Sequence, residues 1–211
     1  AAYASYGYRF SKLTLKAGTR LEYTLNRGLS KSASGNLTFD NSNFNIVPYL
    51  NAAWKIDSRN TLSASYTRRL GRPSVTYLNP YIFEESPYSK MHGNPDLRTV
   101  VSDALTLTYR TSGETWDLTA RTYGSLCNNK IEYLSEVYPD GGKVSTYRNA
   151  VIYNHIDEML SFSWSPGERF SLQTSAMLGY NWFHAPSLEQ KNDGIGWSFD
   201  LSSNVDLWKG A

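Results

Sequence analysis

Three arginines, Arg68, Arg69 and Arg72, lie close together at a point where a predicted strand ends. Arginine presents a planar fork of N–H donors that suits carboxylates and phosphates. The cluster therefore predicts either a binding site for an anionic ligand or a structural set that pairs with carboxylates or lipid phosphates. Pro73 follows Arg72 and favours extended backbone at this exit from the strand.

Two long connections rich in tyrosine, asparagine and serine form the second candidate site. Tyrosine offers a large contact area at a low cost in conformational entropy, so such segments suit contacts with carbohydrates or peptides. The alternative is that they are ordinary solvated loops. The tyrosines that we expect to contact a ligand are Tyr77, Tyr81, Tyr88, Tyr138 and Tyr147.

Groups that could carry out catalysis or hold a metal do not come together in the sequence. The adjacent Asp157 and Glu158 would point to opposite faces of a strand. Cys127 is the single cysteine, and we interpret it as an inert residue leaving a strand. The three histidines fall in different connections, without the spacing of metal ligands: His92, His155 and His184. We therefore expect no enzymatic activity, no metal and no cofactor.

Composition narrows the class of protein. The 211 residues carry 21 Lys and Arg against 19 Asp and Glu, a net charge of +2 without a basic patch, which excludes nucleic acid as a partner. No apolar run is long enough for a membrane-spanning helix. Aromatic residues reach 14% while the mean hydropathy is −0.48. This combination fits a soluble domain and also a transmembrane β-barrel, whose lumen-facing side chains are polar.

Apolar and polar side chains alternate with a two-residue period through most of the chain. From Leu13 to Leu25 every second residue is apolar or small, as in a strand with one apolar side. The pattern predicts about nine strands and no helix. Pro48 cannot donate to a ladder and predicts an interruption of the third strand. The strands lie near residues 3–8, 13–25, 44–56, 62–70, 101–109, 116–120, 156–164, 170–182 and 197–207.

Short and long connections alternate between these strands. In an up-and-down antiparallel sheet this places every short turn on one rim and every long connection on the other, as in outer-membrane barrels. The connection at 127–153 contains a predicted hairpin, 131–138 with 143–147. Short turns are predicted at 10–12, 57–60, 111–114, 165–168 and 209–210, and long connections at 26–43, 71–100, 127–153 and 184–195.

The fold class that follows is all-β: an antiparallel up-and-down transmembrane β-barrel. About 10 to 11 tilted residues cross the apolar band of the outer membrane, and most runs reach that length. Nine strands do not close a barrel that needs an even number, so we expect residues 1–211 to be a partial barrel, one segment of a larger barrel domain. The apolar side should face lipid, and its leucines should not meet in a buried interior: Leu13, Leu21, Leu107, Leu172 and Leu201.

Three motifs follow the fourth strand in order. They are Tyr66-Thr67-Arg68-Arg69 with Arg72-Pro73-Ser74, then Leu78-Asn79-Pro80, then Gly93-Asn94-Pro95-Asp96-Leu97. Together they resemble the barrel of TonB-dependent outer-membrane receptors, in particular the Bacteroidetes branch known as an outer-membrane β-barrel family. The rhythm of strands and turns extends the resemblance over essentially the whole chain. One departure is that Arg98 and Thr99 replace the usual Pro-Glu after the third motif.

This resemblance implies a 22-stranded barrel with an N-terminal plug, which takes up a scarce glycan, peptide or metal chelate across the bacterial outer membrane. Its partners would be outer-membrane lipid, the plug and remaining strands, TonB acting through the plug, and a surface lipoprotein. The arginine cluster would face an anionic ligand or a plug carboxylate. Residues 1–211 show no plug, TonB box or aromatic closing strand, so they would supply part of the wall and four surface loops. The alternative is a soluble β-rich binding module or an adhesion barrel without transport.

Overall fold

A computed structural model describes residues 1–32 and 35–206. Almost every element is a strand, and the two helices have only four and three residues. In chain order the elements are β1 (Ala2–Phe10), β2 (Leu13–Ser32), β3 (Gly35–Lys55), β4 (Asn60–Gly71), α1 (Val75–Leu78), β5 (Phe83–Ser86), β6 (Ser89–Met91), β7 (Val100–Ser112), β8 (Trp116–Val137), β9 (Lys143–Gly167), β10 (Phe170–Ala185), η1 (Pro186–Leu188) and β11 (Gln190–Val205).

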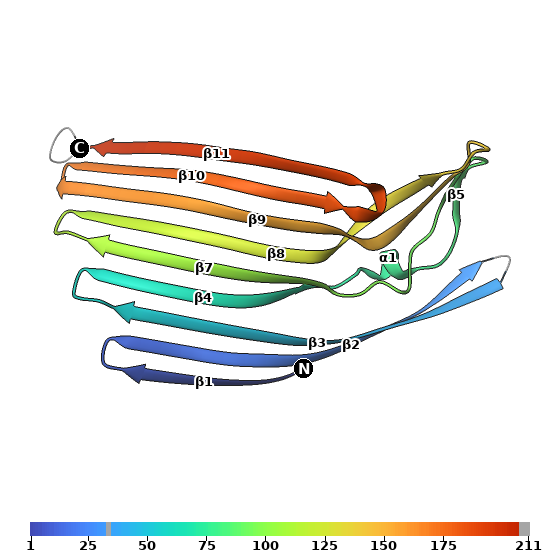
Figure 1. Ribbon diagram of the computed structural model, residues 1–211, viewed down its shortest axis with the longest axis horizontal. Helices are drawn as coiled ribbons and strands as arrows, with labels where there is room; N and C mark the ends of the chain where they lie inside the picture. Colours follow the sequence, from blue (N-terminus) through green and yellow to red (C-terminus); the bar gives the residue numbers. More distant parts are fainter. Residues whose placement is uncertain (33–34, 207–211) are drawn as a thin grey trace.

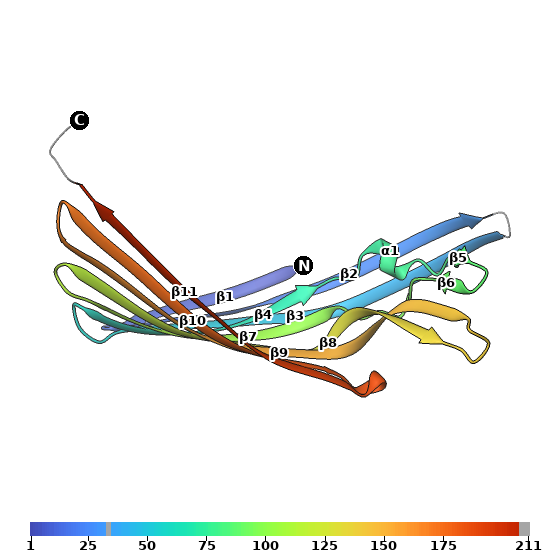
Figure 2. The same ribbon diagram turned by 90° about the horizontal axis from the view of Figure 1, so that it is seen from above.

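Nine strands form one antiparallel wall in the order β1-β2-β3-β4-β7-β8-β9-β10-β11 (Figure 1). Each predicted strand corresponds to one strand of this wall, so the prediction of an antiparallel sheet of nine strands is confirmed. The sheet does not close: β1 and β11 form its two edges, and Figure 2 shows how far β11 is inclined to β1. This arrangement is a partial barrel. The prediction of no helix is wrong at α1, and the sequence pattern did not indicate β5 and β6.

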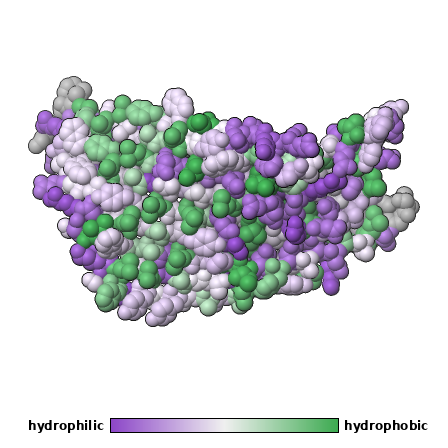
Figure 3. Space-filling model, viewed as in Figure 1, coloured by the Kyte–Doolittle hydropathy of each residue, from purple (hydrophilic) through white to green (hydrophobic). Residues whose placement is uncertain are grey.

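The two faces of the wall differ in polarity, as the two-residue period requires. Leu21, Leu107 and Leu201 share one face and are 41%, 48% and 63% exposed. Figure 3 shows apolar residues spread over the part of the wall near the short turns, with hydrophilic residues towards the other end. The prediction that these leucines do not meet in a buried interior is confirmed. Because no second layer within residues 1–32 and 35–206 covers these leucines, this face is the one suited to lipid.

The connections divide between the two ends of the wall (Figure 1). Short turns join β1 to β2, β3 to β4, β7 to β8 and β9 to β10 at one end, as predicted. The predicted connection at 26–43 is wrong, because β2 and β3 continue as a paired hairpin up to Ser32 and Gly35. The connection at 184–195 is also shorter than predicted, since β11 already begins at Gln190. The turn predicted at 209–210 lies outside the described residues.

Two local predictions on strand continuity are also wrong. β3 runs through Pro48, which stays aligned with Thr19 of β2, while the ladder to β4 ends one residue later at Tyr49. Proline is therefore tolerated where only one neighbouring strand is paired. Cys127 does not leave a strand: β8 continues ten residues beyond it to Val137, and the thiol is buried. The predicted hairpin is confirmed, with Val137 aligned with Lys143.

None of the helices in the described part of the chain has the length and apolar character needed to cross a membrane.

The polarity of the two faces predicts an asymmetric response to charge. Leu160 lies on the apolar face and is 49% exposed, whereas its neighbour Ser161 points to the opposite face. In the complete protein in lipid vesicles, Leu160→Arg should lower the free energy of unfolding by about 2 to 4 kcal/mol, as arginine does near the middle of a bilayer. Ser161→Arg is the matched control and should change it by less than about 1 kcal/mol. Equal losses in urea titrations of the two variants would contradict the assignment of faces.

Candidate functional site

The long connections build a structured region beyond the end of β4 and β7. β4 ends at Gly71 and β7 begins at Val100, whereas the strands β3, β8 and β9 extend further in this direction. Residues 72–99 cross the resulting gap. Within them β5 pairs with β6, and β6 adds to β9 in parallel through Ser89 and Lys143. We call residues 72–99 and the hairpin at 131–149 the platform.

The platform has a small hydrophobic core of its own. Leu78 from α1 and Leu97 from the returning segment are 0% and 1% exposed, and both pack with Phe39 of β3. Ile131 of β8 and Tyr147 of β9 complete the cluster. Water rather than lipid surrounds this end of a barrel, so an internal core is needed to hold the connection in one conformation.

Asparagines on β3 bind the returning segment from one side. The Asn41 amide donates to the backbone carbonyls of Pro95 and Leu97, both at 2.7 Å. Asn43 accepts from the Thr99 backbone N–H at 3.1 Å and donates to Asn41 at 2.8 Å. Asn41 is buried, so leaving its side-chain amide without a hydrogen-bond partner would destabilise the folded protein.

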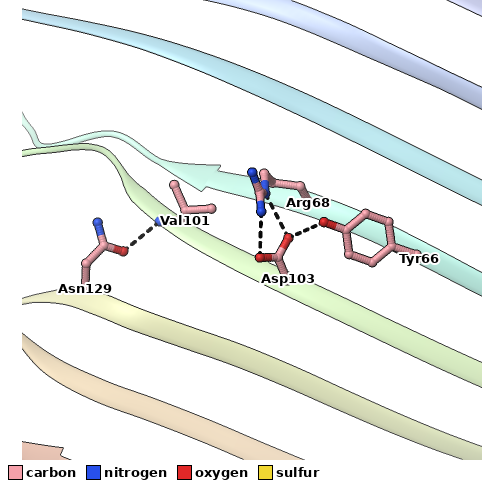
Figure 4. Close-up of polar contacts among 5 residues, drawn as sticks. All are labelled: Tyr66, Arg68, Val101, Asp103 and Asn129. Atoms are coloured by element: carbon pink, nitrogen blue, oxygen red, sulfur yellow. Dashed lines mark hydrogen bonds and ion pairs between the residues drawn. The ribbon is translucent and has the colours of Figure 1, made fainter.

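Asparagines on β8 and β9 bind the same segment from the other side. Asn149 accepts from the Arg98 backbone N–H at 2.8 Å and donates to the Arg98 carbonyl at 3.0 Å. A bulge takes Asn129 out of the ladder, and its side chain accepts from the Val101 backbone N–H (Figure 4). The same side chain donates to the Thr99 carbonyl. Side-chain amides thus replace the backbone ladder on both edges, and residues 95–101 fill the gap in the wall.

Gly93 allows the tight approach that begins this returning segment. Its N–H donates to the Asn79 carbonyl, and the Asn94 N–H donates to the Tyr77 carbonyl. A β-carbon at position 93 would lie 2.5 and 2.6 Å from these two carbonyl oxygens. The second and third sequence motifs therefore meet through their backbones, and both serve to fold the platform.

The three arginines of the predicted cluster do not share one site. Arg68 lies on the apolar face, where its guanidinium donates to both oxygens of Asp103 at 2.8 and 2.9 Å and Tyr66 donates to the same carboxylate at 2.6 Å (Figure 4). Arg69, the next residue of β4, belongs to the opposite face and is exposed. Arg72 pairs with Glu22 of β2, a carboxylate that Arg20 also contacts at 3.2 Å. Arg68 and Arg72 thus have carboxylate partners within the chain.

Two of the predicted tyrosines pack inside the platform. The rings of Tyr77 and Tyr147 are stacked with centroids 4.0 Å apart, and Tyr133 lies 5.1 Å from Tyr147. Burial among these rings raises the pKa of Tyr147 above its ordinary value. The stack joins residues 72–99 to the hairpin of β8 and β9.

The other three tyrosines lie further out. Tyr81 is half-buried and packs edge-on against Phe83 at 4.8 Å. Tyr88 and Tyr138 are 69% and 47% exposed. They lie at the joined tips of the two hairpins, where Tyr88 accepts from Lys143 and Tyr138 donates to Gly142 through their backbones. The structure therefore leaves these two side chains and Tyr77, which is 37% exposed, accessible at the surface, whereas Tyr147 is partly buried.

Sequence reasoning missed the asparagines. One signal was available: Asn41, Asn43 and Asn45 recur with the two-residue period of a strand, so they share one face of β3. Their partners are more than 50 residues away in the chain. The sequence shows the row of amides but not the segment to which it binds.

Comparisons with known proteins agree with this geometry. A sequence model described as the outer membrane protein beta-barrel family matches residues 1–211. A comparison with curated protein sequences gave no match.

Three solved structures show the same fold at low sequence identity. The copper transporter OprC has a TM-score of 0.66 at 13% identity, with 97% of this chain and 32% of that one covered. The FrpB iron transporter of Neisseria meningitidis (F5-1 variant) has a TM-score of 0.63 at 13% identity, with coverages of 94% and 30%. The siderophore receptor PirA of Pseudomonas aeruginosa has a TM-score of 0.53 at 16% identity, with coverages of 93% and 43%. The chain thus spans less than half the length of each.

The contact at Gly93 predicts that Gly93→Ala disrupts the platform. The new methyl group would collide with the carbonyls of Asn79 and Tyr77, and backbone cannot move away as a flexible side chain can. Hydrogen exchange of residues 72–99 should rise at least about tenfold, the effect of losing about 1.4 kcal/mol of local stability. Gly194→Ala is the matched control, since a β-carbon at that position meets nothing within 4 Å. Unchanged exchange in Gly93→Ala would contradict this account of the turn.

The partly buried Tyr147 predicts that the platform loosens at high pH. Its pKa is raised in the folded state, so its contribution to stability is complete below the ordinary tyrosine pKa of 10.0 and is lost as the pH rises through the folded-state value. Proteolysis of the hairpin should therefore accelerate in this alkaline range. Tyr147→Phe keeps the ring and removes the ionisable group, so it should weaken the pH dependence. An identical pH profile in the two proteins would count against the role of Tyr147.

Proposed function

Because the chain belongs to the outer membrane protein beta-barrel family, we propose that residues 1–211 form part of the wall of a TonB-dependent receptor of the bacterial outer membrane. The receptor takes up a scarce ligand, a glycan, peptide or metal chelate, from the cell surface. A separate plug and further strands complete the barrel, which has 22 strands and belongs to the Bacteroidetes branch. Residues 1–211 lie in its C-terminal part and form a segment of a single barrel domain.

The observation that carries this proposal is the asymmetry of the open wall. Nine strands present an apolar face to lipid. The turns that join β1 to β2, β3 to β4, β7 to β8 and β9 to β10 lie at one end, and the platform and the extended hairpin of β2 and β3 lie at the other. Tight periplasmic turns and long extracellular loops are typical of outer-membrane barrels, which supports a position of the platform at the cell surface. The titles of the solved structures name a copper transporter, an iron transporter and a siderophore receptor, which is in line with uptake.

Ligand contact is assigned to the exposed residues of the platform and of the lumen face. Tyr88 and Tyr138 present aromatic rings at the outermost tips, and aromatic rings suit sugar and peptide surfaces. Arg69 is exposed on the lumen face, where it can meet an anionic ligand or a plug carboxylate. Arg68, Arg72, Tyr77, Tyr81 and Tyr147 support these residues by holding the strand ends and the platform in place. TonB supplies energy through the plug, and a surface lipoprotein is a further partner.

The function is tested by uptake in cells that depend on the complete receptor. Replacing both Tyr88 and Tyr138 with alanine should weaken ligand binding at least about tenfold, because each removes a large contact surface at the tip. Arg69→Glu should reduce uptake by a similar factor, since it reverses the charge that faces the lumen.

The matched control is Arg169→Glu, in the short turn between β9 and β10 at the opposite end of the wall. It changes an exposed arginine without touching the platform, and uptake should stay within about twofold of the unaltered receptor. Receptor folded and inserted to the same level in all strains, with uptake unchanged in both platform and lumen variants, would reject this assignment.

A further inference from the structure

The lumen face of β2, β3 and β4 is rich in basic side chains. Because the apolar residues occupy the other face, the lumen face takes the even-numbered residues of β2 and the odd-numbered residues of β3 and β4. Among the described residues of this face Glu22 is the single carboxylate. The face therefore carries an excess of positive charge. Its basic residues are Lys16, Arg20, Lys55 and Arg69, and Arg72 follows directly after β4.

Glu22 holds two of these arginines at the platform end of the face. Its side chain is only 9% exposed, and each of its two oxygens binds one guanidinium group. Oε2 lies 3.2 Å from Nε of Arg20, and Oε1 accepts a hydrogen bond from Arg72. One carboxylate cannot neutralise two guanidinium groups, so this cluster keeps a net positive charge. It differs in this from Arg68, whose charge is balanced by Asp103 alone.

Both guanidinium groups keep donors that Glu22 does not use. The side chains of Arg20 and Arg72 are 48% and 47% exposed. Arg20 contacts the carboxylate through Nε and Arg72 through one terminal nitrogen, so the remaining N–H groups of both can bind a further acceptor. Guanidinium forks suit the oxygens of phosphates and carboxylates. Because Glu22 already restrains the two side chains, an arriving oxyanion would immobilise them at a smaller cost in conformational entropy.

Arg69 adds a third guanidinium group to the same face. Val47 and Arg69 each lie two residues beyond the last aligned pair of β3 and β4, so they share one level of the wall. Val47 is in turn aligned with Arg20 on β2. Arg69 is exposed, and no carboxylate of the described residues forms an ion pair with it. Together with Arg20, Arg72 and Glu22 it makes three positive charges and one negative charge, a net charge of +2.

We propose that Arg20, Arg69 and Arg72 form an anion site, which receives a phosphate or carboxylate group of the ligand as the ligand passes from the platform into the lumen. The inference rests on the proposed function and deepens it, because it limits the ligand to molecules that carry such a group. Arg72 is the first residue of the platform, so the site lies where a ligand arriving from the cell surface enters the lumen. Arg72 thus takes part in binding in addition to holding the platform.

The test measures how fast phenylglyoxal, a reagent for accessible arginines, modifies each arginine of the complete receptor in detergent, by mass spectrometry of its peptides. Inorganic phosphate is the probe, and chloride at the same ionic strength is the reference. Phosphate at about ten times its dissociation constant should slow the modification of Arg20 and Arg72 about tenfold, because only about a tenth of the sites then stays free to react. Arg121 is the matched control, since it is exposed on the lumen face of β8 but lies outside the anion site. Its modification rate should be the same in both salts.

A variant tests whether the arginines act together. Arg20→Gln removes one guanidinium group and leaves Arg72 balanced by Glu22, so the protection of Arg72 by phosphate should fall below about twofold. Arg121→Gln should leave that protection unchanged. If Arg20→Gln does not insert, Arg69→Gln replaces it with the same expected loss.

The proposal is overturned if Arg20 and Arg72 react equally fast in phosphate and in chloride. It is also overturned if they are unreactive in both salts, as they would be when a carboxylate of the plug occupies the site. Modification is read without any uptake measurement. A receptor that takes up its ligand but shows no protection by phosphate therefore rejects the anion site and leaves the proposed function intact.

Discussion

The constraint on which the structure depends is that the wall has no second layer. A soluble sheet buries one face against another sheet or a helix, but here no element among the described residues covers the apolar face from β1 to β11. Lipid must take the place of the missing layer, while the antiparallel ladders satisfy the backbone N–H and C=O groups. In most folds the apolar side chains pack in an internal core, whereas in this one most of them face outward, towards lipid. This explains why few apolar side chains are buried in the described part of the chain and why the buried cluster of Phe39, Leu78 and Leu97 lies at the platform.

Beyond the apolar band the same chain faces the opposite problem. Water can solvate an open loop, so a connection stays ordered only if it builds its own contacts. The platform does so with Leu78, Leu97 and Phe39 as a core and with asparagine side chains in place of a ladder. Asparagine suits this task because one side chain offers both a donor and an acceptor, as a peptide unit does. A gap left by the early end of two strands is thereby closed without additional strands.

The strands of the wall could largely be predicted, because the two-residue period of a strand can be recognised from residues that are consecutive in the sequence. Dependence on this period also explains why the connection at 26–43 was predicted wrongly. At 26–43 the few large apolar residues, Leu29, Leu37 and Phe39, share an alternating set with charged and amide residues, so the pattern loses its contrast although the backbone pairing of β2 with β3 continues. The alternation also separates Arg68 from Arg69, which a reading of the cluster as one site overlooked. The contacts of Asn41 and the pairing of Arg72 with Glu22 join residues at least 50 positions apart, and no local pattern contains that information.

The sequence signature and the proposed ligand-facing surface are different sets of residues. Leu78, Gly93, Asn94 and Leu97 are the distinctive positions, and each is used in the folding of the platform. A residue that packs in a core or closes a tight turn cannot vary with the ligand without loss of the fold. Exposed side chains at the tips, such as those of Tyr88 and Tyr138, are not constrained by packing in this way. A common scaffold can thus present different surfaces, so the signature indicates the architecture of the receptor and leaves the identity of its ligand to the loop tips.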